Sequence, residues 1–120
     1  MSDVQGDYRS IWTGLRDVAF EQKFINVNGL NTRYATAGTK GKPALVMLHG
    51  TAGHWEAFSS NFKAHSADFE IYALDMVGCG FTDKPDQPLE VKDYMAHVLG
   101  FLDAVGVQKA NFMGCSLGAW

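Results

Sequence analysis

The sequence lacks several features that mark whole classes of protein. No apolar run approaches the roughly 18 residues that a membrane-spanning helix needs. Lysine and arginine total 10 against 13 aspartates and glutamates, so a net charge of -3 leaves no basic footprint for nucleic acid. Residues 1–7 lack the basic-then-apolar order of a secretion signal. We therefore expect a protein that binds neither nucleic acid nor membrane.

Cysteine is scarce too, and histidine is scattered. Cys79 and Cys115 both lie in expected loops, which argues against a disulfide framework and favours the cytoplasm. We expect Cys79 to fill a loop and Cys115 to point into the packing of the preceding strand. The histidines have no metal-ligand spacing, so neither a metal nor another cofactor is expected. His54, His65 and His97 are interpreted as surface or loop residues.

What the sequence does contain is the pattern of one globular domain. Its 120 residues are 47% hydrophobic, enough to build a core. Apolar residues recur at roughly helical spacing over Tyr8–Phe20, which predicts a short helix. The β-rich runs Lys23–Val27 and Leu30–Thr36 flank Asn28-Gly29, which predicts a hairpin because both turn residues tolerate positive φ.

From residue 44 onward, strand and helix patterns alternate. The expected strands are Ala44–Leu48, Phe69–Leu74 and Lys109–Met113, and the expected helices are His54–Ala64 and Tyr94–Val105, the latter capped by Gly106. This order predicts an α/β fold, with a mostly parallel sheet, an N-terminal hairpin and helices on both faces. We expect residues 1–21 to form a helical segment and residues 22–120 the N-terminal portion of a single domain.

The pattern Gly-x-Ser-x-Gly directly follows the last expected strand. Gly114, Ser116 and Gly118 form it, and the arrangement is typical of a nucleophile elbow. Such a turn raises the serine hydroxyl above the sheet, holds the serine in a strained conformation and is followed by a helix. The alternative is a Gly-Ser loop that merely closes a strand.

A second glycine-containing loop follows the first buried strand. Acyl transfer needs hydrogen-bond donors where negative charge develops, and the backbone N–H groups of Leu117 and Thr51 are the expected pair. Ala52 or Gly53 replaces Thr51 if the loop is wound differently, and a simple tight turn is the alternative. In His49-Gly50-Thr51 the histidine is interpreted as a brace for the loop rather than a base.

Asp75 follows the second strand of the alternating part. We expect it to hydrogen-bond loop backbone; a role as the acid of a catalytic triad is disfavoured, because that acid normally follows the serine in chain order.

Together these motifs resemble the N-terminal part of the α/β-hydrolase superfamily. The resemblance rests on the Asn28-Gly29 hairpin, Leu48-His49-Gly50, Asp75–Pro85 and Gly114–Gly118, and it covers about residues 22 to 120. The most similar groups are serine esterases and the carbon–carbon bond hydrolases of aromatic ring-fission products. Haloalkane dehalogenases and epoxide hydrolases fit less well, because they carry aspartate where this chain has Ser116.

The resemblance implies a nucleophile, Ser116, and an oxyanion hole built from the N–H groups of Thr51 and Leu117. The family's acid, histidine and lid follow the elbow, whereas all four histidines here precede it. We therefore expect a hydrolase fold truncated after the elbow, a fragment that is inactive alone. Its parent is expected to hydrolyse small-molecule carboxylic esters through an acyl-enzyme, with carbon–carbon cleavage of a ring-fission diketone as the alternative. A serine perhydrolase or acyltransferase and a non-catalytic hydrolase-like binding protein are the alternatives.

Overall fold

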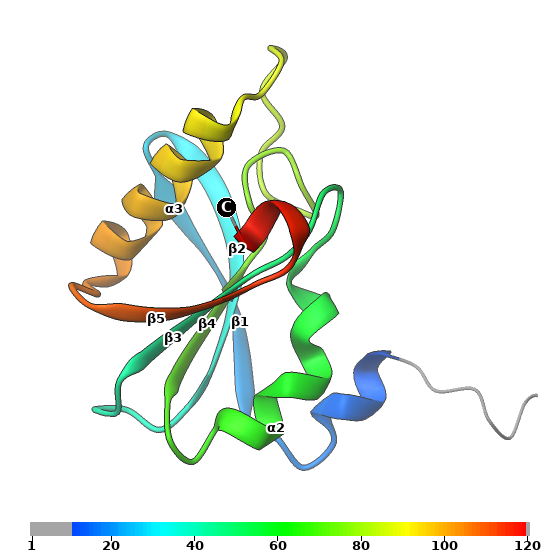
Figure 1. The fold of residues 1–120 in the computed structure, drawn as a ribbon, viewed down its shortest axis with the longest axis vertical. Coiled ribbons are helices and arrows are strands. Elements are labelled where there is room, and N and C mark those ends of the chain that lie inside the picture. Colours follow the sequence, from blue (N-terminus) through cyan, green and yellow to red (C-terminus); the bar gives the residue numbers. More distant parts are fainter. Residues whose placement is uncertain (1–10, 120) are drawn as a thin grey trace, which may run out of the picture.

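A computed structural model describes residues 11–119, whose five strands form one sheet (Figure 1). The strands are β1 (Phe20–Val27), β2 (Leu30–Gly38), β3 (Ala44–Leu48), β4 (Glu70–Leu74) and β5 (Ala110–Gly114). The 3-10 helices are η1 (Ile11–Leu15), η2 (Trp55–Asn61) and η3 (Ser116–Ala119), and the α-helices are α2 (Phe62–His65) and α3 (Val91–Val105).

The sheet is mixed, with strand order β1-β2-β4-β3-β5. β3 runs parallel to both β4 and β5, while β2 is antiparallel to both β1 and β4. The hairpin is as predicted: Val27 pairs with Leu30, and the turn residues Asn28 and Gly29 have φ of +52° and +89°. Positive φ at both positions is the turn geometry that matches the twist of two paired strands. The structure thus confirms an α/β fold with an N-terminal hairpin.

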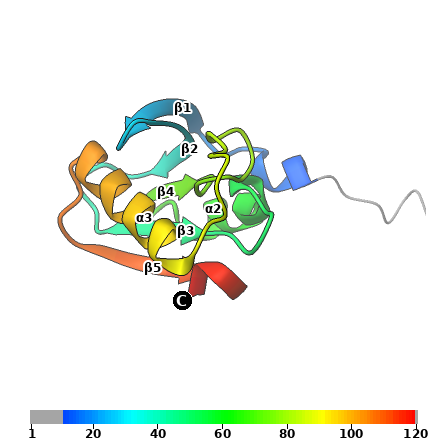
Figure 2. The same cartoon turned by 90° about the horizontal axis from the view of Figure 1, so that it is seen from above.

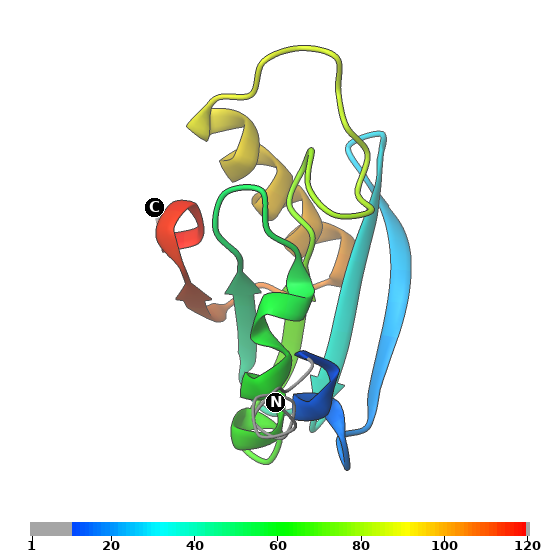
Figure 3. The ribbon, with the colours of Figure 1, turned by 90° about the vertical axis from the view of Figure 1, so that its right-hand side faces the viewer.

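Helices cover both faces of the sheet, as the strand–helix alternation predicts (Figures 2 and 3). On β3, Leu45 and Met47 face the layer formed by η1, η2 and α2, whereas Val46 and Leu48 face α3. The five residues of β3 are all buried, which explains why their apolar run does not alternate. Each buried side chain of this size contributes about 1.5–3 kcal/mol to stability. The parallel strands therefore form a rigid centre from which the loops at their carboxyl ends project.

The helix predicted over Tyr8–Phe20 is wrong in its described part, and residues 8–10 lie outside the described range. Only η1 is helical; Asp17, with φ of +61°, follows it, and Phe20 already pairs with Ala37 in the sheet. The ring of Phe20 packs 5.8 Å, centroid to centroid, from that of Trp55. Sheet pairing and this aromatic contact override the helical spacing of the apolar residues.

The other two predicted helices are present with shifted starts. The segment predicted at His54–Ala64 is η2 followed by α2, and the Trp55 ring stacks on Phe62 at its centre. α3 begins three residues before the predicted start, because Glu90 and Asp93 form a reciprocal capping box. It ends at Gly106, whose φ is +78°, as predicted. Within residues 11–119, no helix has the length and apolar character to cross a membrane.

Candidate active site

A sharp turn connects β5 to η3 and carries Ser116. The Cys115 N–H donates to Leu48 O at 3.1 Å, and the Gly118 N–H donates to Cys115 O at 3.0 Å. Ser116 is exposed and has φ of +54°, a left-handed conformation that costs a non-glycine residue energy and that concentrates at functional sites. The strand, the sharp turn, the following helix and the strained serine are those that the sequence predicts.

Two glycines allow the turn to sit against the end of β3. A Cβ on Gly118 would lie 2.1 Å from Leu48 O, so no other residue fits there without moving the backbone. A Cβ on Gly50 would meet Ser116 Cβ at 3.4 Å and Cys115 O at 3.3 Å. The loop after β3 therefore abuts the Ser116 turn, and both lie at the carboxyl ends of the parallel strands (Figures 1 and 3). Gly114, at the last β5 pairing position, sits opposite Leu48.

The loop after β3 is a tight turn. The Gly53 N–H donates to Gly50 O at 3.0 Å, and Ala52 has φ of +58°. The N–H of Thr51, the second residue of this turn, takes no part in that bond. The Leu117 N–H lies in the first turn of η3, where backbone N–H groups have no partner within a helix. Thr51 and Leu117 thus stand on two segments that meet at Gly50 and Ser116.

His49 is fully buried and links the loops that follow β3 and β4. Its Nε2 accepts the Met76 N–H at 3.0 Å, which leaves the ring proton on Nδ1, 2.7 Å from Gly50 O. Burial lowers the pKa of His49, and the hydrogen bond to Gly50 only partly opposes this. The ring is therefore neutral and braces the backbone, in the role that the sequence predicts for it.

His97 is not the surface or loop residue that we expected. It lies in α3, and its Nδ1 accepts the Val77 N–H at 3.0 Å while its Nε2 lies 2.9 Å from Thr32 Oγ1. Burial lowers the pKa of His97 to about 4. The helical spacing could have predicted that His97 is buried, because position 97 lies three residues after Tyr94 and four before Phe101, on the apolar face of the helix.

Asp75 hydrogen-bonds loop backbone as predicted. Its Oδ1 accepts the Trp55 N–H at 2.7 Å, and its Oδ2 accepts the Phe81 N–H at 2.9 Å. The sequence did not predict that Arg33 pairs with Asp75. Arg33 Nε donates to Asp75 Oδ2 at 2.6 Å, and its two Nη atoms form a two-pronged pair with the Glu56 carboxylate. Burial opposes the charge on Arg33, yet its hydrogen bonds to Asp75 and Glu56 raise its pKa. The ends of several elements are therefore joined by one buried ion network.

Comparison with known proteins places this geometry in a family. The model of the alpha/beta hydrolase fold matches residues 43–119. The chain belongs to this family. Among curated relatives of this alpha/beta hydrolase chain, mouse (Mus musculus) epoxide hydrolase 4 is 29% identical over 101 residues, covering 80% of the chain and 28% of the relative.

Two bacterial relatives have other named activities. The 2-hydroxy-6-oxo-6-(2'-aminophenyl)hexa-2,4-dienoic acid hydrolase of Metapseudomonas resinovorans is 31% identical over 107 residues, 83% of the chain and 35% of the relative. The carboxylesterase YbfK of Bacillus subtilis is 26% identical over 110 residues, with shares of 91% and 36%. The chain thus spans about a third of the length of these relatives.

A solved structure supports the same fold. The crystal structure of a membrane phospholipase A superposes with a TM-score of 0.83 at 21% identity, over 98% of this chain and 36% of that one. This likeness concerns the fold alone, and it extends over nearly the whole hydrolase chain.

The two cysteines of this hydrolase chain differ from each other. Cys79 is buried, as predicted, and burial raises the pKa of its thiol. Cys115 is exposed, so the prediction that it packs into the preceding strand is wrong. The reason is its position: β5 is an edge strand of the described sheet, and Cys115 lies one residue beyond the last pair, Leu48 with Gly114.

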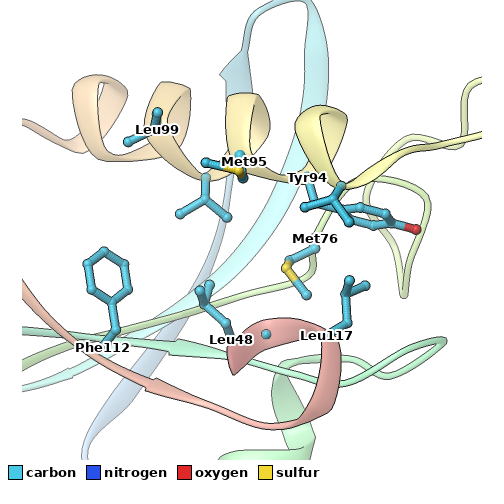
Figure 4. A pocket seen from close by; sticks show the side chains of 10 residues that line it. Leu48, Met76, Tyr94, Met95, Leu99, Phe112 and Leu117 are labelled. Atoms are coloured by element: carbon cyan, nitrogen blue, oxygen red, sulfur yellow. The ribbon is translucent and has the colours of Figure 1, made fainter. Parts of the chain in front are cut away.

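An apolar groove of about 330 Å³ runs beside the Ser116 turn, between α3 on one side and β5 and η3 on the other (Figure 4). Leu117 and Gly118 line its near end, and Met95, Leu99 and Phe112 line it while remaining more than half exposed.

Within residues 11–119, no three histidine, cysteine or acidic side chains are grouped as metal ligands would be.

Proposed function

We propose that the protein carrying this chain is a serine hydrolase that cleaves carboxylic esters through an acyl-enzyme. The observation that carries the proposal is the left-handed backbone of Ser116 between β5 and η3, pressed against the Gly50 loop. A strained serine at the carboxyl end of a parallel strand is how this fold presents a nucleophile. The relatives named as a carboxylesterase and as a dienoic acid hydrolase support hydrolysis at a carbonyl carbon.

In the proposed reaction, Ser116 Oγ attacks the ester carbonyl carbon and loses its proton to a histidine base. The N–H groups of Leu117 and Thr51 hold the negative oxygen of the tetrahedral intermediate. The alcohol leaves with the proton, water attacks the acyl-enzyme, and the acid is released as Ser116 recovers its proton. Removal of one side-chain donor from an oxyanion hole costs about 10²–10³ in rate, which sets the scale expected for such donors.

The base is proposed to come from residues that follow Trp120 in a longer protein. Both ring nitrogens of His49 and of His97 are already engaged in the interior, so neither ring is available to take a proton from Ser116. His65 ends α2, just before β4 and therefore at the opposite end of the sheet. His54, in the loop before η2, precedes the elbow, whereas the histidine of the family follows it. The relatives are about three times as long as the chain, which leaves room for an acid and a histidine. We propose that residues 1–120 alone show no more than trace turnover.

A second candidate is hydrolysis of a carbon–carbon bond in a vinylogous diketone. It is favoured by the 31% identity to a dienoic acid hydrolase, the highest among the three relatives described above. The same serine and the same oxyanion donors would serve. An epoxide hydrolase is disfavoured, because that group resembles this pattern with aspartate in place of Ser116.

The experiment compares p-nitrophenyl butyrate with a ring-fission diketone, using the longer protein and its Ser116→Ala variant. Ester cleavage that is lost in the variant supports the first proposal, and cleavage of the diketone alone supports the second. Full activity in Ser116→Ala contradicts both.

A further inference from the structure

We propose that Arg33 and Glu56 are positioning residues that fix the backbone donor at Thr51 in the loop after β3. The inference rests on the proposed function, because it concerns the oxyanion hole of the same site. Neither side chain belongs to the predicted catalytic set, and neither is proposed to touch substrate. Their role follows from how the two ends of this loop are held.

The first end of the loop is held by the sheet. β3 pairs on both sides as far as Leu48, and His49 is buried and bonded to Met76. In the middle of the loop, Thr51 and Ala52 are exposed and Ala52 has φ of +58°. A strained, exposed turn keeps its shape only when the residues on both sides of it are fixed.

The second end of the loop is held by the ion network. The Trp55 N–H donates to Asp75 Oδ1 at 2.7 Å, and the Glu56 carboxylate receives Arg33 Nη2 at 2.6 Å and Nη1 at 3.1 Å. Glu56 thus fixes the start of η2 three residues after Gly53.

Arg33 is suited to this task because it is rigid and charged. It lies in the middle of β2, with an exposed side-chain fraction of 8% against 10% for Glu56, and its Nη1 also donates to Gln22 Oε1 at 3.2 Å. The ring of Phe81 covers the guanidinium at 4.6 Å. A two-pronged guanidinium–carboxylate pair fixes direction as well as distance, which a lysine cannot do.

Loss of the Glu56 charge breaks the ion pair between Arg33 and Glu56. Glu56→Gln keeps the shape and one acceptor but presents an NH₂ group to a guanidinium that has no acceptor, so the two-pronged pair breaks. The start of η2 is then held by the Trp55–Asp75 bond without the second anchor at Glu56, and we expect the Thr51 N–H to shift with it. A displacement near 1 Å can cost about 10²-fold in rate. Because the oxyanion donor acts in the transition state, kcat falls while KM stays the same.

The test uses the longer protein, with Glu21→Gln on β1 as a matched control, since Glu21 is an exposed carboxylate that pairs with Lys23 at 3.7 Å. Folded sites are counted by titration with a fluorophosphonate, so that kcat refers to competent sites alone. We expect kcat of Glu56→Gln to fall by about 10-fold to 100-fold, with KM within twofold. Binding of a phenylboronic acid, which forms a tetrahedral serine adduct, should weaken in the same proportion as kcat/KM. Glu21→Gln should leave all three quantities unchanged.

Arg33→Lys provides a second route if Glu56→Gln yields no titratable protein. This variant keeps the positive charge but cannot form the two-pronged pair with Glu56, so we expect the same loss of kcat at unchanged KM. A kcat per titrated site within twofold of the parent, or a KM that rises as kcat falls, overturns the inference. Either result is distinct from failure of the proposed function, which would appear as full activity in Ser116→Ala.

Discussion

His97 provides a quantitative test of the buried polar structure beneath the site. The hydrogen bonds around His97 suit a neutral ring. Its Nδ1 accepts the Val77 N–H, and its Nε2 lies within hydrogen-bond distance of Thr32 Oγ1. Its pKa in the folded protein is about 4, against an ordinary value of 6.5. The unfolded chain therefore binds a proton first as the pH falls. The stability that the neutral ring provides is complete above pH 6.5 and is lost as the pH falls towards 4.

The magnitude follows from the size of this shift. Each pKa unit corresponds to about 1.4 kcal/mol, so the free energy of unfolding should fall by about 3 kcal/mol between pH 6.5 and pH 4 through His97 alone. Burial also lowers the pKa of His49, which adds a loss in the same direction. A comparison between variants isolates the His97 contribution, because His49 is common to all of them.

The assay is urea unfolding at several pH values between 4.5 and 7.5. His97→Gln retains a donor for Thr32 and His97→Asn retains an acceptor for the Val77 N–H, and neither titrates in this range. Each variant should be less stable than the parent at pH 7.5 by about 1–3 kcal/mol, the cost of one unsatisfied buried partner. The difference should shrink as the pH falls. His65→Gln, in the half-buried α2 histidine, serves as the control. Parallel stability–pH curves for the parent and both His97 variants would refute the reasoning.

Three further predictions concern single close contacts. Gly118→Ala places a Cβ 2.1 Å from Leu48 O, so ester hydrolysis per folded molecule should fall by at least about 100-fold; an unchanged rate with a native circular dichroism spectrum would contradict the turn geometry. Gly80→Ala forces φ of +54° on a residue whose Cβ would meet Asp75 Oδ2 at 2.2 Å, so the free energy of unfolding should drop by about 2 kcal/mol or more. An unshifted urea midpoint would count against it. In a Cys115→Ser background, Cys79 should react with a thiol reagent only on unfolding, because it is buried with a raised pKa; rapid native labelling would show the loop to be open.

Local features of the fold were predictable from the sequence because their causes are local. Asn28-Gly29 sets the hairpin, the unbroken apolar run of β3 marks a strand buried on both faces, and Gly106 ends α3. The Gly-x-Ser-x-Gly pattern also predicted the turn at Ser116, and the structure shows why its second glycine is needed: a Cβ on Gly118 would lie 2.1 Å from Leu48 O, far along the chain. For the hairpin, the β3 strand and the end of α3, the residues that decide the structure lie within a few positions of one another.

The features that sequence reasoning missed depend on partners far along the chain. Arg33 meets Asp75 and Glu56 across 42 and 23 positions, and no periodicity indicates which strand residue will meet which loop. The exposure of Cys115 depends on β5 being an edge of the described sheet. The helix expected before Phe20 is present only as the short η1, and the chain enters the sheet at Phe20, where pairing with β2 outweighs a weak helical pattern.

The central claim is that Ser116 is the nucleophile of an acyl-enzyme, and trapping that intermediate tests it directly. The longer protein is mixed with excess p-nitrophenyl butyrate, quenched in acid within one turnover and digested for mass spectrometry. We predict a butyryl group on the peptide containing Ser116, absent from Ser116→Ala, with a burst of p-nitrophenol equal to the number of titrated sites. A butyryl group on another residue that turns over, or a Ser116→Ala variant that hydrolyses the ester at the parent rate, would contradict the claim.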